Sequence, residues 1–121
     1  MRDEDSILKS VRGKVVGSED NMEFDKDLLP HINSSLSILN QNGVGLNIIV
    51  TGEEETWGDF KDSTQTEGNK MFQMVPMYVM LNTNILFDPP PPSNVEYHHK
   101  NISELLWRLK IAYEPGSEED E

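Results

Sequence analysis

The sequence has 121 residues, which is enough for one domain with a hydrophobic core of its own. It contains no cysteine, which excludes disulfides and thiolate metal sites, and no run of about 18 apolar residues that could span a membrane. The formal net charge of −12 disfavours direct binding to nucleic-acid phosphates; it serves solubility, or it lets DNA slide past a protein wall without sticking.

A short helix is predicted near the N-terminus, capped by Asp5 or Ser6 and ended by Gly17. Its apolar positions recur on one side and are Ile7, Leu8, Val11 and Val15. Four of the ten basic residues fall in this segment and form what we call the N-terminal cationic patch: Arg2, Lys9, Arg12 and Lys14. The patch is either a solvated helix face or a contact with an acidic neighbouring subunit.

A second helix is predicted after Phe24, with Asp25 or Asp27 as its N-cap and Asn42-Gly43 as its C-cap. Its apolar stripe consists of Leu28, Leu29, Ile32, Leu36 and Leu39. The β-branched residues 44–51 that follow predict an extended segment or a strand, which would need a hairpin or a neighbouring subunit as its partner.

A short capped turn is predicted at Thr56, and it would place Trp57 and Phe60 over the outside of the core. The next long helix is expected over residues 69–87, with a kink at Pro76 because proline removes a backbone hydrogen bond. Methionines recur there every three residues, a period that drifts round a helix and turns some of them outward. Met74 and Met77 are therefore candidates for a subunit interface, together with the N-terminal cationic patch.

Four prolines after Asp88 predict a stiff, extended link to a last helix, which Ser93 and Glu96 would begin as a capping box. The apolar stripe of this helix is Val95, His98, Ile102, Leu105, Leu106, Leu109 and Tyr113. The stripe would close on the preceding helix as an antiparallel hairpin that forms the core. We thus expect an all-α fold: a bundle of about four helices in residues 1–113, a short extended or β-hairpin segment, and a disordered acidic tail in residues 114–121.

Catalytic and cofactor motifs are not evident in the sequence. It has no glycine-rich phosphate loop and no nucleophile elbow, and Glu96 with His99 provides too few ligands for a metal ion. The sequence therefore predicts no enzyme, no metal site and no cofactor.

Five stretches match one known pattern in their order and spacing across about residues 5–110. They are Phe24-Asp25 with His31 to Ser34, Leu39 to Gly45, Thr56 to Phe60, Leu86 to Pro90, and Glu104 to Leu109. Together they make the chain resemble the head–tail connector (adaptor, head-completion) proteins of tailed bacteriophages.

This resemblance implies a virion protein, assembled in the host cytoplasm, that forms a ring of about twelve copies under the portal. Such a ring extends the DNA channel without binding DNA specifically, helps to retain the genome, and receives the next head-completion or tail protein. The C-terminal segment reaches the portal in this family, so the portal-contact candidates are Trp107, Arg108, Lys110, Tyr113 and Glu114.

Two other classes of function compete with this interpretation. One is a small acidic regulator that binds a basic partner as a phosphate mimic. The other is a small metal-dependent enzyme that uses Glu96 and His99. Oligomeric size, salt dependence of binding and metal content separate the three.

Overall fold

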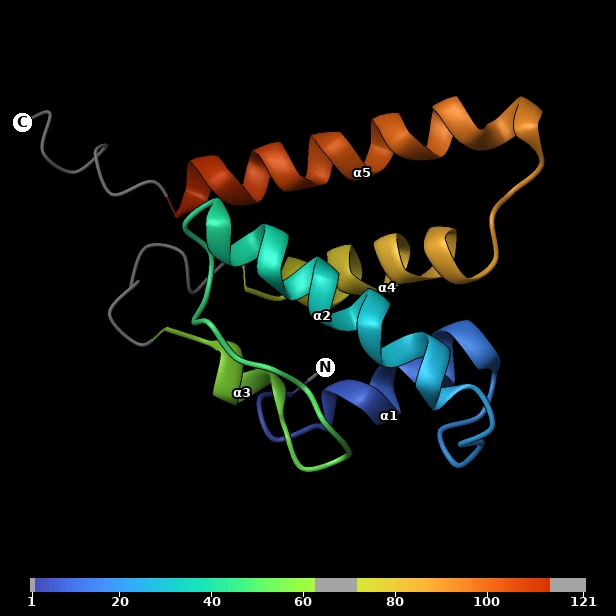
Figure 1. Ribbon diagram of the computed structural model, residues 1–121. Coiled ribbons are helices and arrows are strands. Elements are labelled where there is room, and N and C mark those ends of the chain that lie inside the picture. Colours follow the sequence, from blue (N-terminus) through green and yellow to red (C-terminus); the bar gives the residue numbers. More distant parts are fainter. Residues whose placement is uncertain (1, 63–71, 114–121) are drawn as a thin grey trace, which may run out of the picture.

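The computed structural model describes residues 2–62 and 72–113, and these form an all-α fold without a strand (Figure 1). The elements in chain order are α1 (Ile7–Val11), the π-helix η1 (Arg12–Val16), α2 (Asp25–Gln41), α3 (Trp57–Phe60), α4 (Met74–Phe87) and α5 (Pro92–Ala112). The all-α class predicted from the sequence is confirmed for the described residues. The acidic tail, residues 114–121, lies outside them, as does the expected helix start near Asn69.

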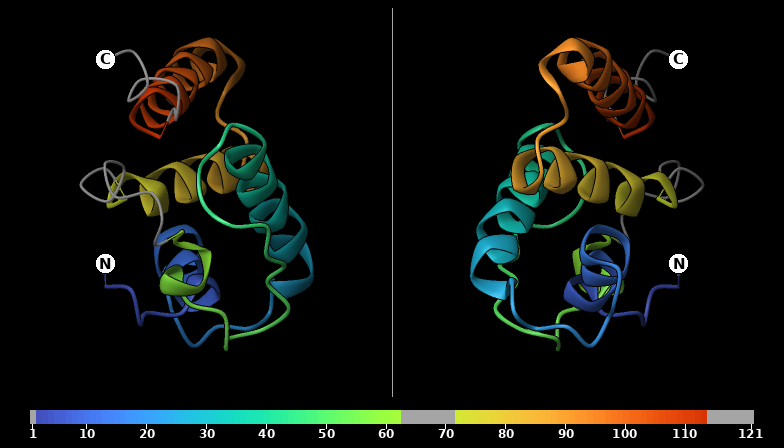
Figure 2. Two further views of the ribbon diagram at one scale, coloured as in Figure 1. Left: turned by 90° about the vertical axis from the view of Figure 1, so that its left-hand side faces the viewer. Right: turned by 90° about the vertical axis from the view of Figure 1, so that its right-hand side faces the viewer.

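Helix α4 lies at the centre of the molecule, between α5 on one side and α1 with η1 on the other, and α2 crosses it (Figures 1 and 2). It is buried on several sides rather than along one stripe, since Val75, Tyr78, Val79, Met80 and Thr83 all lie in the interior. The predicted α4–α5 hairpin is present, but it forms only part of the core. Helix α4 packs more extensively against α2 than against α5. Helix α4 contains no charged residue, so none of its faces has to stay in water.

Pro76 does not kink α4. The helix begins at Met74, so Pro76 is its third residue, where the backbone N–H has no intrahelical partner in any case. The predicted kink is therefore wrong, for the reason that the helix starts later than the apolar pattern suggests.

Helix α5 begins at Pro92 with Pro91 as its N-cap, two residues before the predicted cap at Ser93, and the capping box of Ser93 and Glu96 does not form. A proline at the first helical position already has the φ angle that a helix requires. The predicted stripe of α5 is confirmed at its C-terminal half, where Ile102, Leu105, Leu109 and Tyr113 are buried.

The N-terminal helix has the predicted ends and an unpredicted interior. The hydroxyl of Ser6 accepts a hydrogen bond from the N–H of Lys9 at 3.2 Å, and Gly17 closes the segment with a φ of 97°. Between them the helix widens into η1, and the N–H of Gly17 donates to the carbonyl of Arg12 at 2.9 Å. The wider turn brings the side chain of Arg12 into the interior.

Helix α2 ends as predicted, in a Schellman motif. The N–H of Val44 donates to Leu39 O at 2.9 Å, and that of Gly43 donates to Asn40 O at 3.0 Å. The expected start of α2 is wrong: Phe24 is the N-cap, without a side-chain cap, and the carboxylate of Asp25 binds Arg12 instead.

Residues 44–51 are extended but pair with no strand in the described part of the chain. The side chain of Asn33 takes the place of a strand. Its Oδ1 accepts from the N–H of Val50 at 2.7 Å, and its Nδ2 donates to the carbonyl of Val50 at 3.0 Å. At the other end of the segment, the N–H of Leu46 donates to Phe60 O at 2.8 Å.

The one-turn helix α3 has the predicted cap at Thr56, and Asp59 completes it as a capping box. Trp57 and Phe60, however, are fully buried, which corrects the expectation that they cover the outside of the core. The N-terminal segment covers them: Trp57 N–H donates to Asp5 O at 3.2 Å, and its indole Nε1 donates to Ser10 Oγ at 3.2 Å.

Candidate interaction surfaces

In residues 2–62 and 72–113, no group of three or more His, Asp or Glu side chains is placed to hold a metal ion. Glu96 and His99 are both exposed on α5. No helix in this part of the chain is long and apolar enough to cross a membrane.

Arg12 differs from the other members of the N-terminal cationic patch because its side chain is 1% exposed. It binds Asp25 at two points, Glu53 through Nη1 at 2.5 Å, and the carbonyl of Glu19 at 2.9 Å. The hydrogen bonds to Asp25 raise the pKa of Arg12 above its ordinary value, against the opposing effect of burial, and Glu53 adds to the rise. Its expected place on an exposed cationic face is therefore corrected: Arg12 joins three segments of its own chain.

The other three members of the patch lie on or near the surface. Arg2 is exposed and forms a 3.5 Å ion pair with Glu4, and Lys14 is exposed. Lys9 is half-buried and lines a hollow together with acidic side chains, among them Glu4 and Glu19. These three cations remain candidates for a subunit contact, although their nearest acidic groups belong to their own chain.

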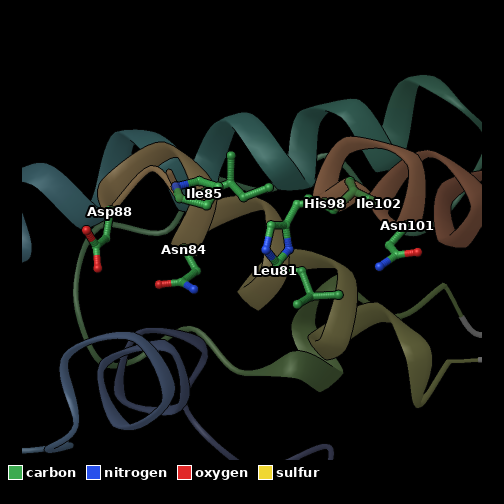
Figure 3. Close-up of a pocket in the computed structure, with 8 residues that line it drawn as sticks. Leu81, Asn84, Ile85, Asp88, His98, Asn101 and Ile102 are labelled. Carbon is green, nitrogen blue, oxygen red and sulfur yellow. The ribbon is translucent and has the colours of Figure 1, made fainter. Parts of the chain in front are cut away.

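A groove runs between α4 and α5, and we call it the α4–α5 groove. It contains two hollows, with cavity volumes of about 120 and 270 Å³. Side chains from both helices line the smaller one, with Asp88 and Pro90 of the link between them (Figure 3 labels all but Pro90): Leu81, Asn84, Ile85, Asp88, Pro90, His98, Asn101 and Ile102. The larger hollow adjoins it and is lined by Met74, Met77, Leu81, Asn101, Glu104, Leu105 and Arg108. Both methionines predicted as interface candidates thus line this groove.

The portal-contact candidates divide into exposed and buried residues. Trp107 and Lys110 are exposed on α5, and Arg108 is exposed at the α4–α5 groove, where it pairs with Glu104 at 3.0 Å. Tyr113 is buried; its hydroxyl has no hydrogen-bond partner among the described residues, and burial raises its pKa to about 12. Glu114 lies outside the described residues. Sequence reasoning missed Ile111, which is exposed one turn after Trp107.

Charge is distributed unequally between the two described parts of the chain. Residues 2–62 contain thirteen acidic and six basic side chains, whereas residues 72–113 contain three of each. The half of the molecule built by α4 and α5 is therefore electrically balanced, and the other half is acidic. This segregation is visible in the sequence, but the net charge of the whole chain obscures it.

Comparison with known proteins identifies one family. A family model described as phage connector protein matches residues 7–116. No curated protein and no solved structure matches the chain.

Proposed function

The chain belongs to the phage connector protein family, and from this we propose that it forms an adaptor ring between the portal and the tail of a virion. The ring has about twelve copies and is assembled in the host cytoplasm. It extends the DNA channel, helps to retain the packaged genome, and offers a surface to the next head-completion or tail protein. The family match over residues 7–116 carries this proposal.

The charge of the chain supports the passage of DNA through such a ring. An acidic wall repels phosphates, so DNA moves past it without being held. Residues 2–62, with their excess of acidic side chains, are the described part of the chain that suits this wall.

The outer side of α5 supports docking to the portal. Trp107 and Ile111 are exposed one helical turn apart, with exposed Lys110 beside Ile111 and with Arg108, next to Trp107, turned toward the α4–α5 groove. An exposed tryptophan next to basic side chains is typical of residues that dominate the binding free energy of protein interfaces. We assign this surface to the portal contact.

Mixing the purified chain with the portal ring from the same genome tests the proposal. We expect an assembly of portal and connector copies that elutes together from a size-exclusion column at near-physiological salt, with a mass measured by light scattering. Absence of any such assembly contradicts the adaptor function.

A matched pair of variants tests the portal contact itself. Trp107 is 62% exposed and Tyr97, on the same helix, is 65% exposed, so neither substitution by alanine removes a core contact. We expect Trp107→Ala to weaken portal binding by at least about tenfold, as loss of a central aromatic anchor does. Tyr97→Ala should bind as the parent chain does. Equal binding by both variants contradicts the assignment of this surface.

The acidic-regulator alternative rests on the same excess of acidic side chains in residues 2–62. A phosphate mimic would remain small in solution, would ignore the portal, and would bind a basic protein with an affinity that falls steeply with salt. The portal experiment therefore separates the two functions.

A further inference from the structure

Two described stretches of this strongly charged chain contain no Asp, Glu, Lys or Arg at all. They are residues 28–52 and residues 72–87. Copies of a chain with a net charge of −12 repel each other, and this repulsion is weakest where the facing surfaces carry little charge. The uncharged stretches therefore mark the surfaces through which one copy can meet another.

The first uncharged surface is the extended segment 44–51, which runs from the end of α2 to α3 (Figure 1). Ile49 is 62% exposed, and Leu46 is exposed beside it. The segment is held against α2 at both ends, by Asn33 at Val50 and by a 3.0 Å hydrogen bond from Asn40 Nδ2 to Gly45 O. It is thus a fixed apolar ridge on the α2 side of the molecule.

The second surface of low charge is the α4–α5 groove. The uncharged helix α4 forms one side of it, and its charged lining residues in the described part of the chain are Asp88, Glu104 and Arg108, of which the last two form an ion pair. Exposed Met77 lines the larger hollow. The amide side chain of Asn84 lines the smaller hollow, and that of Asn101 lines both.

The groove and the ridge lie on different sides of α4. Asn82 marks the α2 side of the helix, because its Nδ2 donates to Ser35 Oγ at 2.9 Å. A helix turns by about 100° per residue, so the α4 residues that line the groove point between about 60° (Ile85) and about 160° (Asn84) away from Asn82. A contact between ridge and groove is therefore a contact between two different faces.

We propose that the extended segment 44–51 of one copy docks in the α4–α5 groove of the next copy. Ile49 and Leu46 enter the apolar hollows, and the amides of Asn84 and Asn101 bond to the backbone of the segment, as Asn33 does within its own chain. Because the two faces differ, the contact is heterologous and repeats from copy to copy until a ring closes. The inference rests on the proposed adaptor ring and specifies which faces build it.

The hollows have a suitable size for apolar side chains. The smaller one, about 120 Å³, is several times larger than the roughly 10–15 Å³ that a single water molecule needs, so a side chain can enter it. Filling it with the side chain of a second copy removes apolar surface of both copies from water, which favours association.

Cross-linking tests the register of this contact directly, because the chain has no cysteine of its own. A chain with Ile49→Cys and Met77→Cys, assembled alone or on the portal ring, is treated with a short bis-maleimide. We expect a ladder of covalent dimers, trimers and larger species on a denaturing gel. The control is Met22→Cys with Met77→Cys, since Met22 is 63% exposed but lies in an acidic loop; it should give no ladder.

A charge substitution tests the contribution of the contact to assembly. Ile49→Asp places a carboxylate in the apolar groove, and we expect the concentration for half-maximal assembly to rise at least about tenfold. Met22→Asp, a matched change at an equally exposed apolar residue, should leave assembly unchanged. Circular dichroism of both variants checks that they fold.

The outcomes separate this inference from the proposed function. A chain that assembles with the portal but gives no ladder, and tolerates Ile49→Asp, overturns the inference and leaves the adaptor function in place. If Ile49→Asp rings form normally and only lose portal binding, the segment faces the portal, which also overturns the inference. A chain that assembles under neither condition contradicts the adaptor function itself.

Discussion

The guanidinium of Arg12 and the carboxylate of Asp25 form a two-point ion pair, with Nε 2.9 Å from Oδ1 and Nη2 2.6 Å from Oδ2. The pair joins η1 to the first turn of α2, and Glu53 binds the same guanidinium from the loop before α3. Because Arg12 is buried, the guanidinium depends on these two carboxylates for the interactions that water would otherwise supply.

Asp25→Ala should therefore lower the free energy of unfolding by about 3 kcal/mol, since it leaves a buried cation with one partner fewer. Asp27→Ala is the matched control, an exposed acid in the same helical turn, and should change stability by less than about 0.5 kcal/mol. Urea denaturation followed by circular dichroism measures both. Equal losses would mean that the ion pair contributes no more than a surface charge does.

Asn33→Ala should release the extended segment 44–51 from α2. It leaves the N–H and the carbonyl of Val50 without the partners that Asn33 provides, and we expect a loss of about 1–3 kcal/mol in stability. Hydrogen exchange gives the local readout, because the amide of Val50 should lose its protection while those of α4 keep theirs. Retained protection at Val50 would show that another group holds the segment.

Gly45→Ala should destabilise the fold more than Gly43→Ala does. Both glycines have positive φ angles, 77° at Gly45 and 86° at Gly43. An alanine at either position must adopt a left-handed backbone, which costs about 1 kcal/mol. A Cβ at Gly43 meets nothing within 4 Å, whereas a Cβ at Gly45 collides with the ring of Phe60. We expect this collision to lower the free energy of unfolding of Gly45→Ala by a further amount of about 1–3 kcal/mol. Urea titrations of both variants give the difference between their free energies of unfolding.

Local sequence rules predicted the parts of this fold that depend on neighbouring residues. The N-cap at Asp5 or Ser6, found at Ser6, the cap at Thr56 and the C-cap at Asn42-Gly43 all follow from hydrogen bonds within a few residues. The buried stripe of α5, which includes Leu105, follows from its period.

The same rules failed where distant segments compete for one group. Asp25 has the residue type of an N-cap, but a two-point bond to Arg12 is stronger than a single cap bond. Residues 44–51 have the composition of a strand, but Asn33 satisfies their backbone from α2. The α4–α5 groove was missed because apolar periodicity indicates which positions are buried, not where two helices leave a space between them.

Leu105→Asp should unfold the protein or come close to it. Leu105 is a buried member of the α5 stripe, and a carboxylate there is placed among apolar side chains without a partner. Trp107→Asp is the matched control on the same helix, since its exposed side chain leaves the core unchanged. Thermal unfolding followed by circular dichroism should show a cooperative transition for Trp107→Asp and a lost or strongly lowered one for Leu105→Asp. A folded Leu105→Asp protein would mean that α5 does not need this stripe.

The dependence of stability on alkaline pH tests how tightly Tyr113 is packed at the end of α5. Burial raises the pKa of its hydroxyl to about 12, above the ordinary value of 10.0, and burial raises the pKa of Tyr78 as well. The folded state therefore holds the phenolic protons more tightly than the unfolded state does. This contribution is fully present below pH 10 and is lost as the pH rises toward 12.

Tyr113→Phe should separate this effect from the rest of the chain. The hydroxyl of Tyr113 has no hydrogen-bond partner among the described residues, so its removal should leave stability at pH 7 unchanged or slightly higher. Between pH 10 and pH 12 the variant should lose less stability than the parent, because one buried group no longer ionises on unfolding. Urea titrations at pH 7, 10 and 11 measure the difference. A variant that is less stable at pH 7 would show that the hydroxyl has a partner after all.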